Sequence, residues 1–385
     1  MKNHVDEKQQ DSFSQQVGMT DWQHMASDIN AVDESSVAQA LTKSRANQRL
    51  SLDDFKALIS PAAAPYLEHM AMESQRLTQQ RFGKTIQLFV PLYLSNMCSN
   101  ICTYCGFSME NKIRRTTLNL EQIRAEAEAI RAKGFEHVLI VTGESERKVG
   151  IEYFEQALGV LKEYFSHIAM EVQPLKEEEY RRLHELGVES ILVYQETYHR
   201  EKYAKYHLKG KKSDFDYRLQ TPERVGRAGI NKVGLGCLLG LEDWRTDAFY
   251  VAKQLRFLEK QFWSMKFSLA FPRLRPCEGG GEVNSPMNER ELVQLICAYR
   301  IFNQQVELSL STRESAVFRN NMMALGITTM SAESKTQPGG YANDDKSLEQ
   351  FSIDDNRTVD EIAKMITDKG YQVVWKDWQQ GLVSQ

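Results

Sequence analysis

The sequence predicts an α/β protein built on a TIM-type (β/α)8 barrel, with a helical N-terminal extension and a short C-terminal tail. Eight apolar segments of strand length alternate with helical segments, as in a chain of βα units. Their apolar runs are continuous, which is typical of parallel strands covered on both faces. Polar or glycine-rich segments follow most of them, where a barrel carries its functional loops. A doubly wound open sheet is the competing architecture.

The composition is that of an ordinary globular protein and excludes several classes of function. The chain has 385 residues, of which 42% are hydrophobic and 26% charged. A net charge of −4 gives no basic field, so we expect no nucleic-acid partner. A mean hydropathy of −0.49 and the lack of a long apolar run argue against a membrane span. The polar start lacks the apolar core of a secretory signal, so we expect a cytoplasmic protein.

Four regions follow one another along the chain. Residues 1–20 are polar, and we expect them to be disordered. Residues 21–83 have helical patterns and form the N-terminal extension. Residues 84–334 contain the alternating segments and form the barrel, and residues 335–385 form a tail that packs on it.

The boundaries of the elements are marked by ordinary start and stop signals. Ser51 precedes a helix whose first turn is acidic, as expected of an N-cap. Helices in 120–134 and 175–187 both end in glycine, which suits a left-handed C-cap. The strand candidates, in chain order, are 85–95, 137–143, 167–173, 190–196, 232–239, 264–271, 306–312 and 327–331.

Three cysteines follow the first strand candidate within eight residues: Cys98, Cys102 and Cys105. Clustered thiolates in a large intracellular chain favour zinc or an iron–sulfur cluster over disulfides. Structural zinc normally takes four protein ligands, whereas a [4Fe–4S] cluster on three thiolates keeps one iron open. Zinc and a disulfide remain the alternatives. The other cysteines are expected to be small buried apolar residues: Cys237, Cys277 and Cys297.

The Cys-x3-Cys-x2-Cys spacing, with Tyr104 before the last cysteine, resembles the radical S-adenosylmethionine (SAM) enzymes. The resemblance extends to one family, the 2-iminoacetate synthases, which are the tyrosine lyases of bacterial thiamine biosynthesis. It runs from about residue 50 to residue 378. It is carried by the segments VPLYLSN, TYCGFS, MEVQPL, VYQETYH, FPRLRPC, LSLSTRES and SKTQPGGYA.

The resemblance implies a radical SAM barrel with a [4Fe–4S] cluster held by Cys98, Cys102 and Cys105, and with SAM on the open iron. An external donor such as flavodoxin or ferredoxin reduces the cluster, and SAM yields methionine and 5′-deoxyadenosine. The Cα–Cβ bond of L-tyrosine is cleaved to 2-iminoacetate (dehydroglycine) and p-cresol. The imine supplies the thiazole moiety of thiamine, so thiazole synthase is the expected protein partner.

The same resemblance suggests which residues bind SAM. Tyr104 is expected near the adenine, mainly through its backbone. The relatives carry Gly-Gly-Glu where this chain has a threonine in place of the first glycine. For the two later glutamates the alternative interpretation is an ion-paired charge at the rim. The positions concerned are Thr142, Gly143, Glu144, Glu171 and Glu196.

An amino-acid substrate brings a carboxylate, for which a guanidinium is the natural bidentate partner. Arg313 follows the seventh strand candidate and is our choice. Ser331, at the end of the eighth, is expected to bind the same carboxylate. Tyr93 faces either the substrate or the outside of the barrel. Arg273 and Arg275 alternate, so we expect one to face inward and one outward.

Three other functions remain as alternatives. A tryptophan lyase of similar fold differs only in its pocket. The hydrogenase-maturation tyrosine lyase carries a second cluster on a cysteine-bearing C-terminal extension, and this sequence has no cysteine after Cys297. A non-catalytic metal-binding scaffold is the third alternative.

Overall fold

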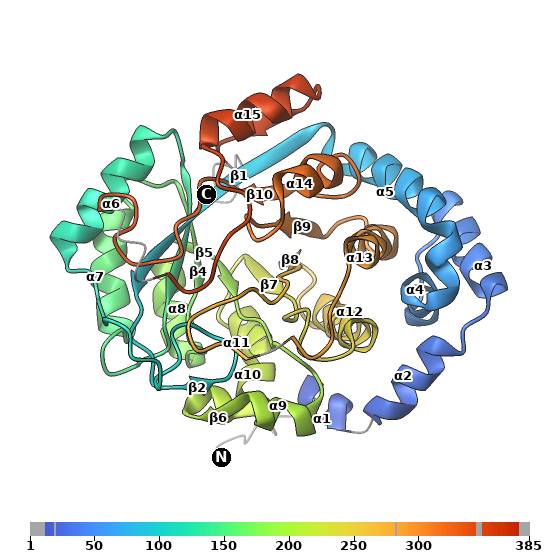
Figure 1. Cartoon of the computed structure of the whole chain (residues 1–385), viewed down its shortest axis with the longest axis horizontal. Coiled ribbons are helices and arrows are strands. Elements are labelled where there is room, and N and C mark those ends of the chain that lie inside the picture. Colours follow the sequence, from blue (N-terminus) through green and yellow to red (C-terminus); the bar gives the residue numbers. More distant parts are fainter. Residues whose placement is uncertain (1–11, 19–20, 282, 344–348, 377–385) are drawn as a thin grey trace, which may run out of the picture.

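The computed structural model describes residues 12–18, 21–281, 283–343 and 349–376. Its centre is a closed barrel of eight parallel strands (Figure 1), which confirms the predicted fold class. The first and last barrel strands pair in parallel, with Gln87 opposite Thr329, so the open-sheet alternative is wrong. The barrel strands are β1 (Thr85–Ser95), β3 (His137–Thr142), β4 (His167–Glu171), β5 (Val188–Leu192), β7 (Lys232–Leu235), β8 (Lys266–Ala270), β9 (Glu307–Leu310) and β10 (Thr329–Ser331).

All eight expected strands are present. β1 has the predicted bounds, and each of the other seven begins or ends at a different residue. β5 differs at both ends, because it spans Val188–Leu192 where the sequence predicted a strand over residues 190–196. Glu196 has a left-handed backbone with φ of 72°, which a β-strand cannot accommodate. Its carbonyl instead accepts a hydrogen bond from the Leu238 N–H at 2.8 Å. The end of this segment therefore bends over the mouth of the barrel.

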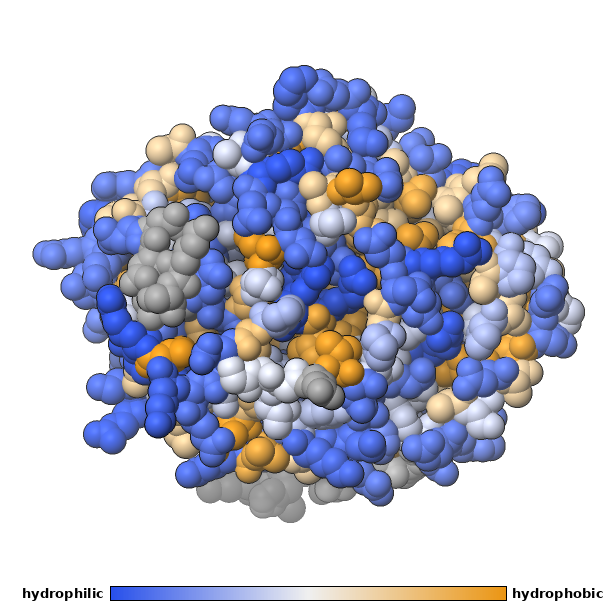
Figure 2. Space-filling model, in the orientation of Figure 1, coloured by the Kyte–Doolittle hydropathy of each residue, from blue (hydrophilic) through white to orange (hydrophobic). Residues whose placement is uncertain are grey.

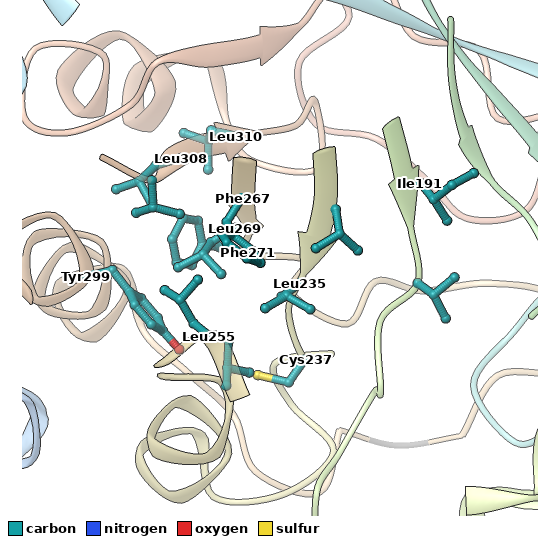
Figure 3. Close-up of a cluster of buried hydrophobic side chains, with 14 of the residues drawn as sticks. Ile191, Leu235, Cys237, Leu255, Phe267, Leu269, Phe271, Tyr299, Leu308 and Leu310 are labelled. Atoms are coloured by element: carbon teal, nitrogen blue, oxygen red, sulfur yellow. The ribbon is translucent and has the colours of Figure 1, made fainter. Parts of the chain in front are cut away.

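Helices surround the barrel, as expected of βα units. Gly134 and Gly187 have φ of 90° and 95°, which confirms the predicted left-handed helix ends. Leu255 and Tyr299 project from two of these helices toward Leu269 and Leu308 on the strands (Figure 3), and this layer is the main core. The helices are α6 (Leu120–Ala132), α7 (Ile151–Leu161), α8 (Glu177–Glu185), α11 (Thr221–Arg227), α12 (Trp244–Gln261), α13 (Glu289–Phe302) and α14 (Ala316–Met322).

The N-terminal extension covers α12 and α13. Ser51 caps its helix in a capping box with Asp54, as the sequence predicted. Of the start that we expected to be disordered, residues 1–11 and 19–20 lie outside the described residues. Residues 13–18 are helical and Phe13 is buried, so this part is ordered. The elements are α1 (Phe13–Gly18), α2 (Trp22–Asn30), α3 (Glu34–Arg45), α4 (Leu52–Ile59), η1 (Pro61–Tyr66) and α5 (Leu67–Phe82).

Smaller elements lie over the carboxyl ends of the barrel strands. Two short strands pair antiparallel there, and one of them contains Cys102. They form a cover beside the three-cysteine loop. These elements are β2 (Ile101–Cys102), α9 (Arg200–Tyr206), β6 (His207–Lys209), η2 (Lys211–Ser213) and α10 (Phe215–Leu219).

The C-terminal region returns across the barrel. Residues 349–357, here called the strap, run over the mouth and contact the loops after β8 and β9. The chain continues as α15 (Val359–Asp368) and β11 (Gln372–Val374), which pairs in parallel with β1. Trp375 packs edge-on against Phe135.

The face that carries the mouth is mostly hydrophilic, with a few apolar patches near its centre (Figure 2). Inside the barrel, the amino-terminal end is polar. His137 and His167 lie with ring centroids 3.7 Å apart, and Lys232 pairs with Glu307 at 2.8 Å. In the part of the chain that the structure describes, no helix has both the length and the apolar character needed to cross a bilayer.

Candidate active site

One cavity opens at the carboxyl ends of the barrel strands, and the loops after most of the strands contribute to it. The structure brings to this cavity every residue that the sequence predicted to bind the cluster, SAM or the substrate carboxylate, and Tyr93 as well. They are Tyr93, Cys98, Cys102, Tyr104, Cys105, Thr142, Gly143, Glu144, Glu171, Glu196, Arg313 and Ser331. A parallel barrel explains this convergence, because all its strands end at the same face.

The three-cysteine loop is held in place by backbone contacts. Cys102 donates its N–H to the Ser108 hydroxyl at 3.1 Å, while the short strand around it pairs with β6. The Arg115 guanidinium donates to four backbone carbonyls of the loop, at distances of 2.6 to 3.2 Å. Gly143 lies directly against the Met97 carbonyl, where a Cβ would not fit. The loop is therefore fixed before any cofactor binds.

The donor set fits a [4Fe–4S] cluster. All six cysteines are free thiols, so the disulfide alternative is not supported. Among the described residues, no three His, Cys, Asp or Glu side chains converge as ligands of a single metal ion, which disfavours zinc. In a cluster each thiolate binds a different iron, so the three sulfurs need only surround a common space. Cys98, Cys102 and Cys105 surround such a space.

The remaining cysteines differ from one another. Cys237 and Cys297 are buried in the apolar core, as predicted. Cys277 is only half-buried, and its thiol donates to the Tyr104 carbonyl at 3.2 Å. It therefore packs against the three-cysteine loop instead of lying in the core, which corrects the prediction for this residue.

Tyr104 is anchored by a histidine that the sequence left unassigned. Its hydroxyl lies 2.7 Å from His207 Nε2, and His207 Nδ1 lies 2.8 Å from the Tyr203 carbonyl. The carbonyl can only accept, so Nδ1 carries the proton and Nε2 accepts from the Tyr104 hydroxyl. Burial lowers the pKa of His207 to about 2, which keeps the ring neutral.

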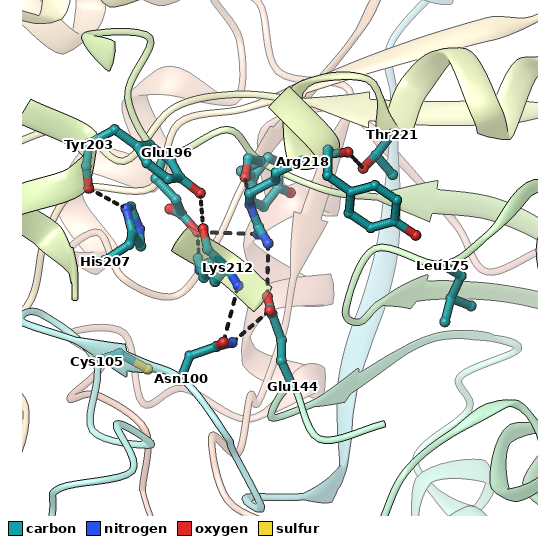
Figure 4. Close-up of polar contacts among 12 residues, drawn as sticks. Asn100, Cys105, Glu144, Leu175, Glu196, Tyr203, His207, Lys212, Arg218 and Thr221 are labelled. Atoms are coloured by element: carbon teal, nitrogen blue, oxygen red, sulfur yellow. Dashed lines mark hydrogen bonds and ion pairs between the residues drawn. The ribbon is translucent and has the colours of Figure 1, made fainter. Parts of the chain in front are cut away.

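A network of buried charges lies beside the three-cysteine loop (Figure 4). Glu144 accepts from Arg218 at 2.9 Å and from the Asn100 amide at 2.8 Å, and Glu196 accepts from Lys212 at 2.6 Å. Burial alone would raise the pKa of both carboxyl groups, but Arg218 and Lys212 outweigh it and hold each pKa below its usual value. Glu196 is thus ion-paired, as the alternative interpretation expected, but it lies inside the cavity and not at the rim.

Lys212 and Arg218 are residues of this site that sequence reasoning missed. Lys212 belongs to a short basic run with Lys209 and Lys211. Gly210, with φ of 91°, turns the chain so that Lys212 points into the cavity and Lys211 points outward. No signal in the sequence distinguishes these neighbouring lysines, because only the turn decides which one is buried.

Glu171 is the least compensated acid of the cavity. Burial raises its pKa to about 7, and Arg313 only partly opposes that effect. Glu196 adds a like charge and raises the pKa further. Near neutral pH, Glu171 therefore exchanges a proton without a large cost.

Arg313 lies on the opposite wall. Its guanidinium is 3.5 Å from the centre of the Phe351 ring, and one of its nitrogens donates to the Arg273 carbonyl at 3.3 Å. Ser331 accepts a hydrogen bond from the Thr312 N–H at 3.1 Å, close to the same wall. Much of the Arg313 donor capacity thus remains available to a ligand.

The two alternating arginines do not divide into an inward and an outward residue as predicted: both are less than a fifth exposed and both pair with Glu314, although only Arg275 lines the cavity. Arg275 lines the cavity and pairs with Asp354 of the strap at 2.8 Å. Arg273 is bound by Glu314 and donates to the Met287 carbonyl at 3.0 Å.

The strap supplies two further cavity residues that sequence reasoning missed, Gln350 and Phe351. The Tyr93 hydroxyl donates to Gln350 Oε1 at 2.8 Å, so Tyr93 faces the inside of the barrel. The outward alternative for Tyr93 is wrong. More than 250 residues separate the two, and no local pattern indicates such a contact.

Two family models match the chain. The model of the radical SAM superfamily matches residues 92–250, which include the three-cysteine loop and the buried charges. The model of the biotin and thiamin synthesis associated domain matches residues 270–372, which include Arg313, Ser331 and the strap.

Curated relatives match almost the whole chain. The 2-iminoacetate synthase of Escherichia coli (strain K12) is 53% identical over 368 residues, covering 95% of this chain and 97% of the relative. The 2-iminoacetate synthase of Salmonella typhimurium is 51% identical, covering 96% and 98%. Among solved structures, the FeFe-hydrogenase maturase HydG from Carboxydothermus hydrogenoformans superimposes with a TM-score of 0.88 at 29% identity, covering 96% of this chain and 86% of that one.

Proposed function

The chain belongs to the 2-iminoacetate synthases, a family of radical SAM enzymes, and from this premise we propose that it cleaves the Cα–Cβ bond of L-tyrosine to 2-iminoacetate and p-cresol. Its cofactors are a [4Fe–4S] cluster and SAM. The observation that supports the proposal best is the convergence on one cavity of three thiols, a buried acid–base network and a buried guanidinium.

The cofactor end of the cavity would bind the cluster and SAM through this chain's own residues. Cys98, Cys102 and Cys105 would ligate three irons. When bound, the cluster and SAM supply the radical chemistry that removes a hydrogen atom from the substrate. Glu144 and Glu196 are held ionised by Arg218 and Lys212, so they are ready to accept hydrogen bonds from the amino and ribose hydroxyl groups of SAM.

The opposite wall would bind the amino acid. The Arg313 guanidinium suits a carboxylate, and Ser331 lies beside it as a second hydrogen-bonding group. An aromatic substrate ring requires an apolar wall. The cavity has one, made of Phe89, Leu139, Val141, Leu192, Tyr194 and Phe271.

The strap and the three-cysteine loop cover the cavity and would keep water from the reacting atoms. Arg313, packed on Phe351, would align the tyrosine carboxylate so that the amino group and the Cα–Cβ bond face the SAM end. Thiazole synthase is the proposed recipient of the imine, and flavodoxin or ferredoxin the proposed electron donor, as the family membership suggests.

The test is product analysis under strict anaerobiosis. The reconstituted protein, with SAM, L-tyrosine and reduced flavodoxin, is expected to release p-cresol and 5′-deoxyadenosine in similar amounts. L-Tryptophan in place of L-tyrosine is the matched control and is expected to yield little 5′-deoxyadenosine. Formation of carbon monoxide or cyanide would favour the hydrogenase-maturation chemistry, and no 5′-deoxyadenosine above that of a Cys102→Ala variant would refute the lyase assignment.

A further inference from the structure

Gln350 of the strap contacts one of the three thiols. Its side-chain Nε2 lies 3.6 Å from Cys105 Sγ, within the range of an N–H···S hydrogen bond. The cysteine is 245 residues earlier in the chain. An amide donor thus points at a sulfur that would carry negative charge once it ligates iron.

Tyr93 determines which end of the Gln350 amide faces the sulfur. The Tyr93 hydroxyl donates to Gln350 Oε1 at 2.8 Å. Burial and the nearby Glu171 raise the pKa of Tyr93, so the phenol stays protonated and remains a donor. With the amide oxygen bound by Tyr93, the NH2 group faces Cys105, whose thiolate can only accept a hydrogen bond.

The backbone around Gln350 is fixed on the side of the three-cysteine loop. Its N–H donates to the Thr336 carbonyl at 3.0 Å, and the Thr336 hydroxyl donates to the Phe351 carbonyl at 3.0 Å. Its carbonyl lies against Gly106, the residue after Cys105, at a point where no Cβ would fit. This close approach brings the Gln350 side chain within reach of the thiol.

The other end of the strap is clamped by charge. Asp355 is fully buried in an ion pair with Arg319 and also accepts from Arg357 at 2.7 Å. The N–H groups of Asp354 and Asp355 both donate to the Thr312 carbonyl, at 3.0 and 3.1 Å. Because both ends are held, the Gln350 amide has little freedom to leave the thiol.

We propose that Gln350 is a positioning residue that raises the reduction potential of the cluster by donating a hydrogen bond to the Cys105 thiolate. The inference rests on the proposed function, since it requires the cluster to bind at these cysteines. A cluster gains one negative charge when it is reduced, and a hydrogen bond to a ligand sulfur stabilises the more negative state. Gln350 would therefore ease the transfer of an electron from the external donor.

The first test compares Gln350→Met with Gln337→Met. Gln337 belongs to the same tail and does not line the cavity, so it is the control; it is more deeply buried than the half-buried Gln350. The readout is the midpoint potential of the SAM-free cluster, from a dithionite titration followed by electron paramagnetic resonance. We expect Gln350→Met to lower the equilibrium constant for one-electron reduction about tenfold, which lowers the midpoint potential by about 59 mV. Gln337→Met should leave the midpoint potential unchanged.

Two further variants examine the orientation of the amide. Gln350→Glu replaces the donor by a carboxylate oxygen, and the potential is expected to fall at least as far as in Gln350→Met. Tyr93→Phe frees the amide to rotate, and the expected decrease is smaller than in Gln350→Met. A purely structural role for Gln350 predicts no ordered series of potentials.

A spectroscopic measurement on the unmodified chain needs no variant to fold. With 15N in glutamine side-chain amides, the reduced SAM-free cluster is expected to show a 15N hyperfine coupling. If that coupling is absent, or if Gln350→Met holds full iron with an unchanged potential, the inference is overturned. If the unmodified chain binds no cluster at all, the proposed function fails first, so the two failures are distinguishable.

Discussion

The backbone carbonyl of Gln350 packs so closely against Gly106 that position 106 has no space for a side chain. Gly106 follows the last cysteine of the three-cysteine loop, and Gln350 belongs to the strap near the end of the chain. The contact is between two backbones, so neither side can adapt by rotating a side chain. The strap and the cysteine loop are therefore one packed unit.

Gly106→Ala is expected to displace the strap or the cysteine loop. Overpacking of this kind costs about 1–3 kcal/mol of unfolding free energy, and it should also lower the iron content after reconstitution. Gly159→Ala is the control, because Gly159 lies in α7 and no atom lies near the position of a Cβ there. Alanine at this position should increase the free energy of unfolding by at most about 1 kcal/mol. Urea denaturation and iron analysis of both variants measure the effects. Equal stability and full iron in Gly106→Ala would contradict the packing.

Cys102→Ala is expected to abolish the cluster while the chain still folds. Two thiolates are too few to retain a [4Fe–4S] cluster against air or chelators. Cys297→Ala removes an equally small buried thiol within α13, and it should keep the full iron content with a stability loss of about 1 kcal/mol. Iron and sulfide analysis with the visible absorption spectrum compares the two. A cluster retained in Cys102→Ala would refute the ligand assignment.

Arg313→Gln is expected to reduce the p-cresol rate while leaving the cluster spectrum unchanged. Hydrogen bonds to charged groups contribute about 1.5–3 kcal/mol, so the loss of the guanidinium should cost roughly 10–100-fold in kcat/KM for tyrosine. Arg181→Gln changes an exposed arginine on α8 and serves as the control. A lost cluster with Arg313→Gln would instead indicate a structural role for this residue.

Lys212→Met and Lys211→Met compare the loss of a lysine inside the cavity with the loss of its exposed neighbour. Lys212 is buried against Glu196 at 2.6 Å, and its removal leaves Glu196 with only the longer 3.5 Å contact to Arg218. Breaking a buried pair costs about 3–5 kcal/mol, and SAM binding should weaken as well. The exposed Lys211 pairs with Glu146, so Lys211→Met should change stability by less than about 1 kcal/mol. Calorimetric SAM binding and urea denaturation test both.

Glu171 should make the stability of the cluster-free chain depend on pH. Burial raises its pKa from 4.5 to about 7, so the folded state favours the neutral acid. The contribution of Glu171 to the free energy of unfolding is fully present below pH 4.5 and is lost as the pH rises through about 7. Glu171→Gln should therefore gain stability relative to the unmodified chain across that window, by on the order of 3 kcal/mol.

Urea denaturation at about pH 5 and about pH 8 measures this difference. Glu185→Gln, on the exposed surface of α8, is the control and should show no such gain. An identical pH dependence in the unmodified chain and in Glu171→Gln would show that Glu171 is not titrating in this range.

The sequence by itself determined the barrel and the membership of the site. Continuous apolar runs such as that in His137–Thr142, whose residues are all buried, are typical of strands covered on both faces of a sheet, and helices separate these runs. Once eight such strands are parallel, the residues that follow them meet at one end. For this reason Cys98, Glu144 and Arg313 could be placed in one cavity without any knowledge of their contacts.

Only the tertiary structure decided which neighbouring residues complete the site. The Lys212 side chain is only 12% exposed and that of Lys211 is 70% exposed, because the left-handed Gly210 turns the chain just before them. Composition contains no information on such a turn. Gln350 reaches Cys105 across a separation of 245 residues, through a strap held by backbone contacts. Local patterns report which face of an element is buried. They contain no information on which distant segment covers it, because that choice depends on how whole elements pack together.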